Sequence, residues 1–174
     1  MIQKYAFIHR LLHWLIALGI IGLLAAGLYM TSLENDDPQR FELYSLHKSF
    51  GVTVLGLAIL RLFSRGLTYI PPMPEGLKLI EKILAHTVHA FLYIAMFAMP
   101  LSGIFMSNAA GYSVKLFSIE LPRVVEKNST VGGIAHDIHE YGAWVLIALI
   151  SLHVLGALKH KFIDKENDVL PRML

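Results

Sequence analysis

The 174-residue sequence contains no cysteine and few charged residues. Without cysteine the chain can form no disulfide, thiolate metal site, iron–sulfur cluster or thiol nucleophile. Only 16% of its residues are charged and 55% are hydrophobic, and a mean hydropathy of +0.56 excludes a disordered chain. A formal net charge of +2 is too small to indicate a nucleic acid or another polyanion as a partner.

Nine histidines stand out against this apolar background. Burying a polar imidazole in hydrocarbon costs free energy unless its nitrogens find partners. The histidines are therefore the residues from which a functional hypothesis should start.

Four apolar segments are long enough to cross a membrane as helices, since a bilayer core about 30 Å thick needs about 20 helical residues. The expected spans are residues 11–30, 45–63, 84–107 and 138–158. The first is uncharged and lacks a signal-peptide cleavage site, so we expect it to be retained. These spans predict an all-α fold, an integral membrane four-helix bundle in contact with lipid, formed by one domain of residues 1–174.

The charged residues between the spans indicate an orientation. Four spans place both termini on one side, and the prolines at positions 71, 72 and 74 interrupt any helix in the middle connector. If the first and third connectors lie outside, ten of the fifteen Lys and Arg residues lie inside: Lys4, Arg10, Arg61, Arg65, Lys78, Lys82, Lys159, Lys161, Lys165 and Arg172. The positive-inside rule then places both termini in the cytoplasm.

Small residues recur along three of the spans. They are Gly19, Gly22, Ala26, Gly27, Gly51, Gly56, Gly142 and Ala143. Two explanations stay open at this point: close packing of helices in lipid, or room for a flat cofactor between them.

Four of the histidines fall into two pairs by depth. His139 and His153 are 14 residues apart, nearly four helical turns, so they lie within roughly 40° of one face and about 21 Å apart. His13 follows the cytoplasmic Arg10 by three residues and is level with His153, whereas His47 begins the second span and is level with His139. We therefore expect an inner pair, His13 and His153, and an outer pair, His47 and His139.

Two imidazoles that face each other across a helix bundle are typical of a six-coordinate haem, in which each Nε2 binds the iron. Zinc is a poorer match, because it takes four ligands in structural sites and three plus water in catalytic sites. The lack of cysteine favours noncovalent, b-type haem. The sequence thus predicts two haem b groups with His13, His47, His139 and His153 as ligands of the iron, and the alternative is four polar residues hydrogen-bonded within the bundle.

Other polar residues near the inner level carry weaker signals. His86 and His89 could contact a quinone carbonyl or a haem propionate, or mark the end of a helix. Arg61 and Arg65 could pair with haem propionates or serve as plain positive-inside anchors.

Three histidines fit neither pair. His9 and His160 are expected at the membrane interface, although His160 could also overhang an inner quinone pocket. His136 is roughly 100° away from the stripe that carries His139 and His153, and it lies nearer the charged loop.

The sequence resembles the bacterial cytochrome b561 family of four-helix, dihaem membrane proteins over nearly its whole length. The matching segments are LLHWLIA at 11–17, LHKSFGVTVLGLAILRL at 46–62, LAHTVHAFLYIAMFAMPLSGIFMSNAAGYSV at 84–114 and HEYGAWVLIALISLHVLGALKH at 139–160. The resemblance implies the same four axial ligands as the depth argument. The helical core is also similar to the cytochrome b subunits of hydrogenases and formate dehydrogenases.

Irons with two protein ligands have no open position for dioxygen, so the expected chemistry is electron transfer with a membrane quinone as a partner. The resemblance further implies a place in the bacterial inner membrane, oxidation of superoxide to dioxygen at the periplasmic face and ubiquinone as the quinone. A small anion needs a cationic path to the outer haem, and four outer residues could provide it: Lys48, Lys115, Arg123 and Lys127. Six carboxylates share that side, however: Glu34, Asp36, Asp37, Glu42, Glu120 and Glu126.

Two other function classes remain. The chain could be an electron-carrying subunit that passes electrons between quinol and a periplasmic redox protein. It could also be a histidine-based transporter, which would have no visible chromophore.

Overall fold

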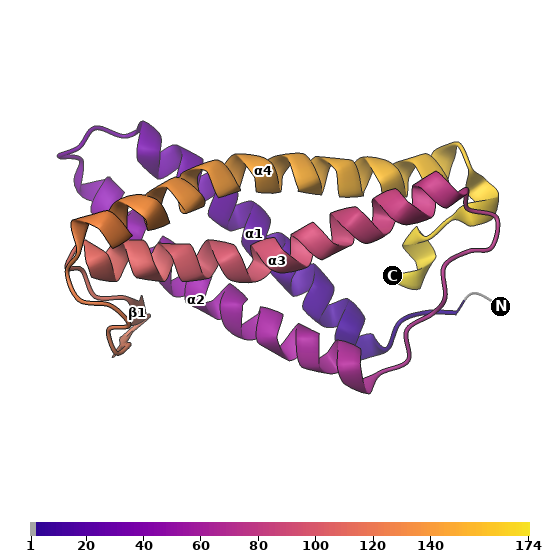
Figure 1. The fold of residues 1–174 in the computed structure, drawn as a ribbon, viewed down its shortest axis with the longest axis horizontal. Coiled ribbons are helices and arrows are strands. Elements are labelled where there is room, and N and C mark those ends of the chain that lie inside the picture. Colours follow the sequence, from indigo (N-terminus) through magenta and orange to yellow (C-terminus); the bar gives the residue numbers. More distant parts are fainter. Residues whose placement is uncertain (1–2) are drawn as a thin grey trace.

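The computed structural model describes residues 3–174 and consists mainly of four long helices (Figure 1). They are α1 (Phe7–Ser32), α2 (Pro38–Leu67), α3 (Leu79–Ala109) and α4 (Ser129–Phe162). Each helix contains one of the expected spans and extends beyond it at both ends. All four are long and apolar enough to cross a membrane, so the predicted all-α membrane bundle is confirmed.

The start of α1 and the end of α4 lie at the same end of the bundle (Figure 1). We call this the inner end, and we call the opposite end, where α3 connects to α4, the outer end. That the inner end faces the cytoplasm stays a prediction. Two short 3-10 turns follow α4 at the inner end, at Lys165–Asn167 and Leu170–Arg172.

Local sequence signals explain where the helices begin. Asp37 caps α2 by accepting a hydrogen bond from the backbone N–H of Gln39 at 2.8 Å, and Pro38 occupies the first helical position, where no N–H is needed. The side chain of Asn128 caps α4 in the same way, accepting from Val131 N–H at 3.0 Å. Residues 68–78, which contain the three prolines, form no helix.

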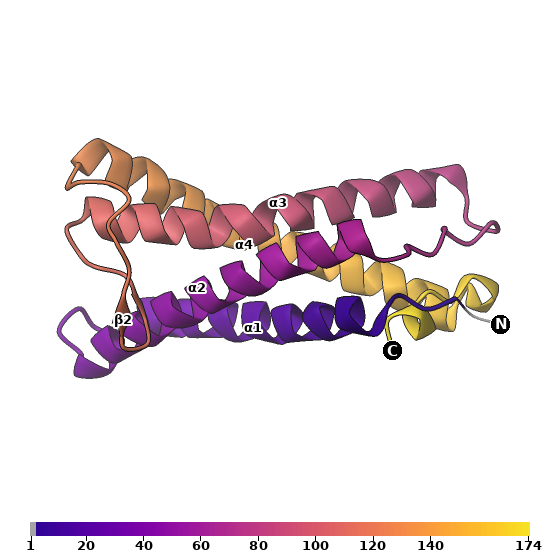
Figure 2. The ribbon, with the colours of Figure 1, turned by 90° about the horizontal axis from the view of Figure 1, so that it is seen from below.

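The helices pack chiefly as two pairs, α1 with α2 and α3 with α4, and α2 also contacts α3 (Figure 2). A Cβ added to Gly19 would lie 2.8 Å from Val54 Cγ2, and one added to Gly142 would lie 2.7 Å from Met99 Sδ. Close packing therefore accounts for these two glycines. Gly22 and Gly51 have no atom within 4 Å of such a Cβ, and for them the choice between the two explanations stays open.

Large apolar side chains cover the outside of all four helices. Leu18, Phe63, Ile94 and Leu155 are each more than 60% exposed. A surface of this kind would aggregate in water, but it is the surface that lipid solvates.

A hairpin of β1 (Lys115–Leu116) and β2 (Ile119–Glu120) lies at the outer end, in the connection between α3 and α4. The sequence analysis did not predict it. The chain after α4 folds back over the inner end, where Trp14 Nε1 donates to the Met173 carbonyl at 2.8 Å and Tyr5 N–H donates to the Arg172 carbonyl at 3.1 Å.

The packing at Gly19 gives a first testable prediction. We expect Gly19→Ala to lower the thermal unfolding midpoint of the detergent-solubilised protein, because the new methyl group meets Val54, a buried, β-branched side chain with little rotamer freedom. Overpacking of this kind costs about 1–3 kcal/mol. Gly22→Ala, on the same helix with open space beside it, is the matched control and should not lower the midpoint. Equal effects of both substitutions would contradict this account of α1–α2 packing.

Candidate functional site

The structure brings the four histidines together in the two expected pairs. The ring centroids of His13, on α1, and His153, on α4, are 6.1 Å apart with an angle of 69° between the rings. The centroids of His47, on α2, and His139, on α4, are also 6.1 Å apart, at 74°. Both pairs bridge α4 to the α1–α2 half of the bundle, one at each level.

The same 14-residue spacing places two residues from each helix at these levels. The inner level has His13, Arg61, His89 and His153, and the outer level has Gly27, His47, Gly103 and His139. The two glycines lie against imidazoles: a Cβ on Gly27 would be 3.5 Å from His47 Cε1, and one on Gly103 would be 3.3 Å from His139 Cε1. The outer histidines thus occupy space that these glycines leave free.

The two outer imidazoles differ in the hydrogen-bond partners of Nδ1. His139 Nδ1 lies 3.0 Å from the Met99 carbonyl oxygen and 3.1 Å from Ser102 Oγ. His47 Nδ1 is buried and has no hydrogen-bond partner among residues 3–174. The sequence analysis did not identify Met99 and Ser102 as contacts of His139. The available signal was Gly103, which is 14 residues after His89 and indicates the face of α3 beside which both residues lie.

At the inner level, the ring of His89 packs edge-on against that of His153, with centroids 5.3 Å apart. His89 is therefore beside the inner pair, as the sequence suggested. His86 is exposed.

His9 is only 2% exposed and lies in the first turn of α1, so its ring faces the neighbouring helices at the inner end, and its position at the membrane interface stays a prediction. Its Nδ1 lies 3.2 Å from Ser64 Oγ on α2, and its ring stacks on Tyr5. Burial is possible because the neighbouring helix supplies a hydrogen-bond partner.

Arg61 is 9% exposed and donates from Nη1 to the His9 carbonyl at 2.8 Å. Its guanidinium carbon lies 5.9 Å from the centre of the Tyr93 ring, and that of Arg65 lies 5.6 Å from the same ring. The side chain of Arg61 therefore lies inside the bundle, and the choice between a propionate contact and a positive-inside anchor stays a prediction.

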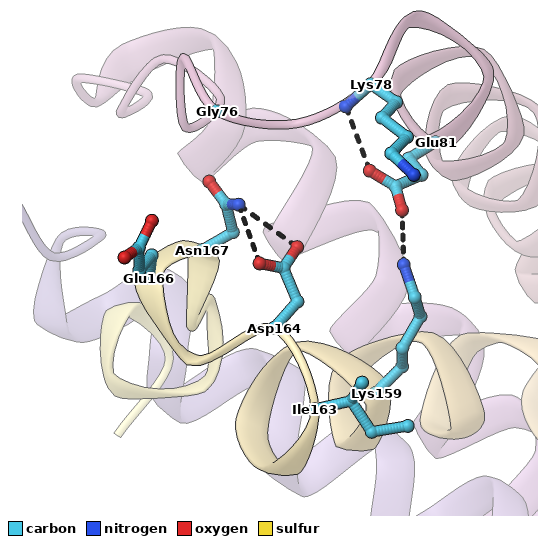
Figure 3. Close-up of a pocket in the computed structure, with 8 residues that line it drawn as sticks. All are labelled: Gly76, Lys78, Glu81, Lys159, Ile163, Asp164, Glu166 and Asn167. Atoms are coloured by element: carbon cyan, nitrogen blue, oxygen red, sulfur yellow. Dashed lines mark hydrogen bonds and ion pairs between the residues drawn. The ribbon is translucent and has the colours of Figure 1, made fainter.

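His160 lies at the inner end, near a polar cavity of about 570 Å³ between α3 and the chain after α4 (Figure 3). Its Nδ1 is 3.1 Å from Asp164 Oδ2. Glu81, in the lining, forms an ion pair with Lys159. The lining residues include none of the paired histidines, so this cavity is separate from both levels.

His136 pairs with Glu140 on the exposed side of α4 at 3.2 Å.

The four cationic residues of the outer side form two groups. Lys48, beside His47, donates from Nζ to Ser107 Oγ and to the Ser113 carbonyl, both at 3.3 Å. Lys115 begins the hairpin, whose backbone is bonded to Ser49: Ser49 Oγ donates to the Lys115 carbonyl at 2.9 Å and accepts from Phe117 N–H at 3.1 Å.

The second group surrounds Gly111, which has a φ of +92°. Arg123 Nη2 donates to the Gly111 carbonyl at 3.1 Å. Lys127 Cδ would lie 3.7 Å from a Cβ on that glycine.

The spacing of both pairs fits a metal held between two imidazoles. Metal–nitrogen bonds of about 2.0 Å, with each ring centre about 1 Å behind its nitrogen, place two such rings roughly 6 Å apart. The observed centroid distance is 6.1 Å in each pair. Met99 and Ser102 engage Nδ1 of His139 and thereby leave Nε2, the nitrogen that binds haem iron, available.

Residues 4–174 match the family model described as prokaryotic cytochrome b561. The chain belongs to this family. Prokaryotic cytochromes b561 bind haem b and transfer electrons within the membrane, so the protein is a multi-pass bacterial membrane protein with oxidoreductase-type chemistry.

Curated relatives agree with this assignment. The chain is 32% identical to "Cytochrome b561 homolog 2" of Escherichia coli (strain K12) over 173 residues, which cover 99% of this chain and 92% of that protein. It is 27% identical to "Probable superoxide oxidase CybB" of Yersinia pestis over 174 residues, which cover 98% of this chain and 96% of that protein.

The attachment of the hairpin gives a second prediction. Ser49→Ala removes the acceptor of the Phe117 N–H and the donor to the Lys115 carbonyl. Losing a buried partner costs about 1–3 kcal/mol, so we expect the Phe117 amide to exchange hydrogen about 5- to 150-fold faster by mass spectrometry. Thr53→Ala removes a hydroxyl that bonds only within α2, at 3.0 Å to the Ser49 carbonyl, and should leave hairpin exchange unchanged.

Proposed function

We propose that this cytochrome b561 binds two haem b groups, oxidises superoxide at its outer end and reduces ubiquinone at its inner end. The observation that carries the proposal is the pair of facing imidazoles at each of two levels, both with a centroid distance of 6.1 Å. His47 and His139 are the outer ligands, and His13 and His153 are the inner ligands.

Bound haem supplies a one-electron iron couple at each level. Because the chain offers two imidazoles to each iron, no coordination position is left for dioxygen or another substrate. The residues therefore hold and orient redox centres, and their substrates react at the edges of these sites.

The reaction balances when two superoxide anions are consumed per quinone. Each superoxide loses one electron and leaves as dioxygen, and ubiquinone takes up two electrons and two protons to become ubiquinol. Two one-electron sites suit this exchange, since together they can store the pair of electrons that a quinone accepts.

The outer end has a cationic group suited to a small anion. Lys48 is next to His47 in sequence, and hydrogen bonds to Ser107 and Ser113 hold its ammonium group in place. A fixed positive charge at the outer end, on the helix that carries His47, raises the local concentration of anions there. Lys115, Arg123 and Lys127 extend the positive charge along the outer connection.

At the inner end, polar groups that could contact quinone carbonyls or haem propionates lie beside the inner pair. His89 touches the ring of His153, and Arg61 lies inside the bundle at the same level. We assign these contacts to His89, whose ring touches that of His153, and to Arg61 rather than to His160, which is engaged by Asp164.

A second candidate is an electron carrier that exchanges electrons with a periplasmic redox protein. The observation in its favour is the hairpin tip, where Phe117 and Ile119 are 55% and 64% exposed. Apolar side chains on a projecting turn are typical of protein-docking surfaces.

The ligand assignment is tested by haem content. We expect the purified protein to contain two b-type haems per chain, and His139→Ala to contain about one, because an iron with one remaining imidazole is held weakly. His153→Ala should lose the other haem. The haem that remains should therefore have a different midpoint in each of the two variants in a redox titration. His136→Ala, an exposed histidine on the same helix, is the control and should retain both haems. If His139→Ala kept both haems, the pairing would be wrong.

The substrate assignment is tested by stopped-flow mixing of superoxide with the oxidised protein. We expect rapid reduction of the haem spectrum, slowed roughly tenfold in Lys48→Glu because the attractive charge is reversed. Lys165→Glu makes the same charge change at the inner end and should react at the unchanged rate. A spectrum that superoxide leaves oxidised would reject this substrate and favour the electron carrier.

A further inference from the structure

We infer that Ser102 and the Met99 carbonyl are positioning groups for His139 that lower the reduction potential of the outer site relative to the inner site. The inference rests on the proposed role of His139 as an outer haem ligand. It gives the electron path of the proposed function a direction, from the outer end to the inner end.

The hydrogen bonds at His139 determine which of its nitrogens carries the proton. The Met99 carbonyl can only accept, and it lies 3.0 Å from Nδ1. Nδ1 must therefore carry the hydrogen, and Nε2 has the free lone pair. Ser102 Oγ is 3.1 Å from the same nitrogen and donates its own hydrogen to the Met99 carbonyl at 2.9 Å, which completes a ring of three groups.

The sequence of α3 explains why the imidazole fits here. Ser102 is only 6% exposed, so its hydroxyl is shielded from competing water. Gly103 leaves space for the ring, because a Cβ there would lie 3.3 Å from His139 Cε1. The helices approach closely at this level, since a Cβ on Gly142 would meet Met99 Sδ at 2.7 Å. Pro100, inside α3, follows Met99 directly and has no backbone N–H to donate within the helix.

A ligand imidazole that donates its second N–H to a carbonyl becomes a stronger electron donor to the metal. Stronger donation stabilises the oxidised iron and lowers the reduction potential. The opposite ligand, His47, has no such partner among residues 3–174. The Met99–Ser102 contact is thus the feature of the outer pair that supplies this effect.

At the inner level, the surroundings raise the reduction potential instead of lowering it. Arg61 is buried there and bonded to the His9 carbonyl, one helical turn before His13. A positive charge near an iron favours its reduced state. A low outer potential and a high inner potential together drive electrons from the outer site to the inner site.

The test is an optical redox titration of the purified, haem-loaded protein, with low-spin ferric EPR spectra as a second readout. We expect Ser102→Ala to raise one of two midpoints and to leave the other unchanged, because one acceptor of His139 is lost while the Met99 carbonyl remains. A threefold change in the oxidised-to-reduced ratio at fixed potential corresponds to about 28 mV for one electron. The EPR signal of the same component should shift.

Ser102→Thr keeps the hydroxyl and should restore the original midpoint. Ser151→Ala, on α4, removes a hydroxyl that bonds only to the Ile147 carbonyl and should leave both midpoints in place. If Ser102→Ala does not fold, Ser102→Cys replaces it, with a weaker acceptor and an expected shift of the same component in the same direction.

The inference is overturned if both haems are retained and neither midpoint moves, if both midpoints move equally, or if Ser102→Thr behaves as Ser102→Ala does. Failure of the proposed function would look different. It would appear in the unsubstituted protein, as fewer than two haem b groups or as haems that superoxide does not reduce.

Discussion

The bundle is organised by the near-coincidence of 14 residues with four helical turns. Because of it, every helix presents one residue to the interior at each of two levels. On α4 both residues are histidines, His139 and His153, and each faces one partner from the α1–α2 half. The nitrogens of imidazoles at this depth need hydrogen-bond or metal partners that lipid cannot supply. The other helices therefore lie where their residues can help to supply these partners.

The two levels differ because the remaining helices fill them differently. At the outer level, Gly27 and Gly103 leave room around the imidazoles, and Met99 engages His139. At the inner level, the corresponding positions hold Arg61 and His89, which bring charge and polar atoms. A chain with the same residues at both levels would provide two equivalent sites, whereas this one provides a compact outer site and a polar inner site.

Periodicity and charge placement were enough to predict the four spans and the facing of the histidine pairs, since both depend on spacing along single helices. The burial of His9 could not be predicted, because it depends on Ser64, 55 residues away on another helix. The hairpin was missed for the same reason, as it is attached through Ser49. The burial of Arg61 agrees with its 14-residue spacing from His47, whereas the sequence left its role open between a propionate contact and a positive-inside anchor.

The surroundings of Lys48 bear on the choice between a small anion and a protein as the outer partner. Docking proteins contact broad surfaces made by many side chains. The Lys48 ammonium is instead held by Ser107 and Ser113 in the angle between α2 and the outer connection, and Tyr112 lies over it at 5.9 Å. A single ammonium group held in this way is suited to attract an ion of two atoms, whereas it offers little of the broad surface that a docking protein needs. This geometry, together with the inward rise in reduction potential that we infer from His139 and Arg61, is why superoxide is the outer substrate that we propose.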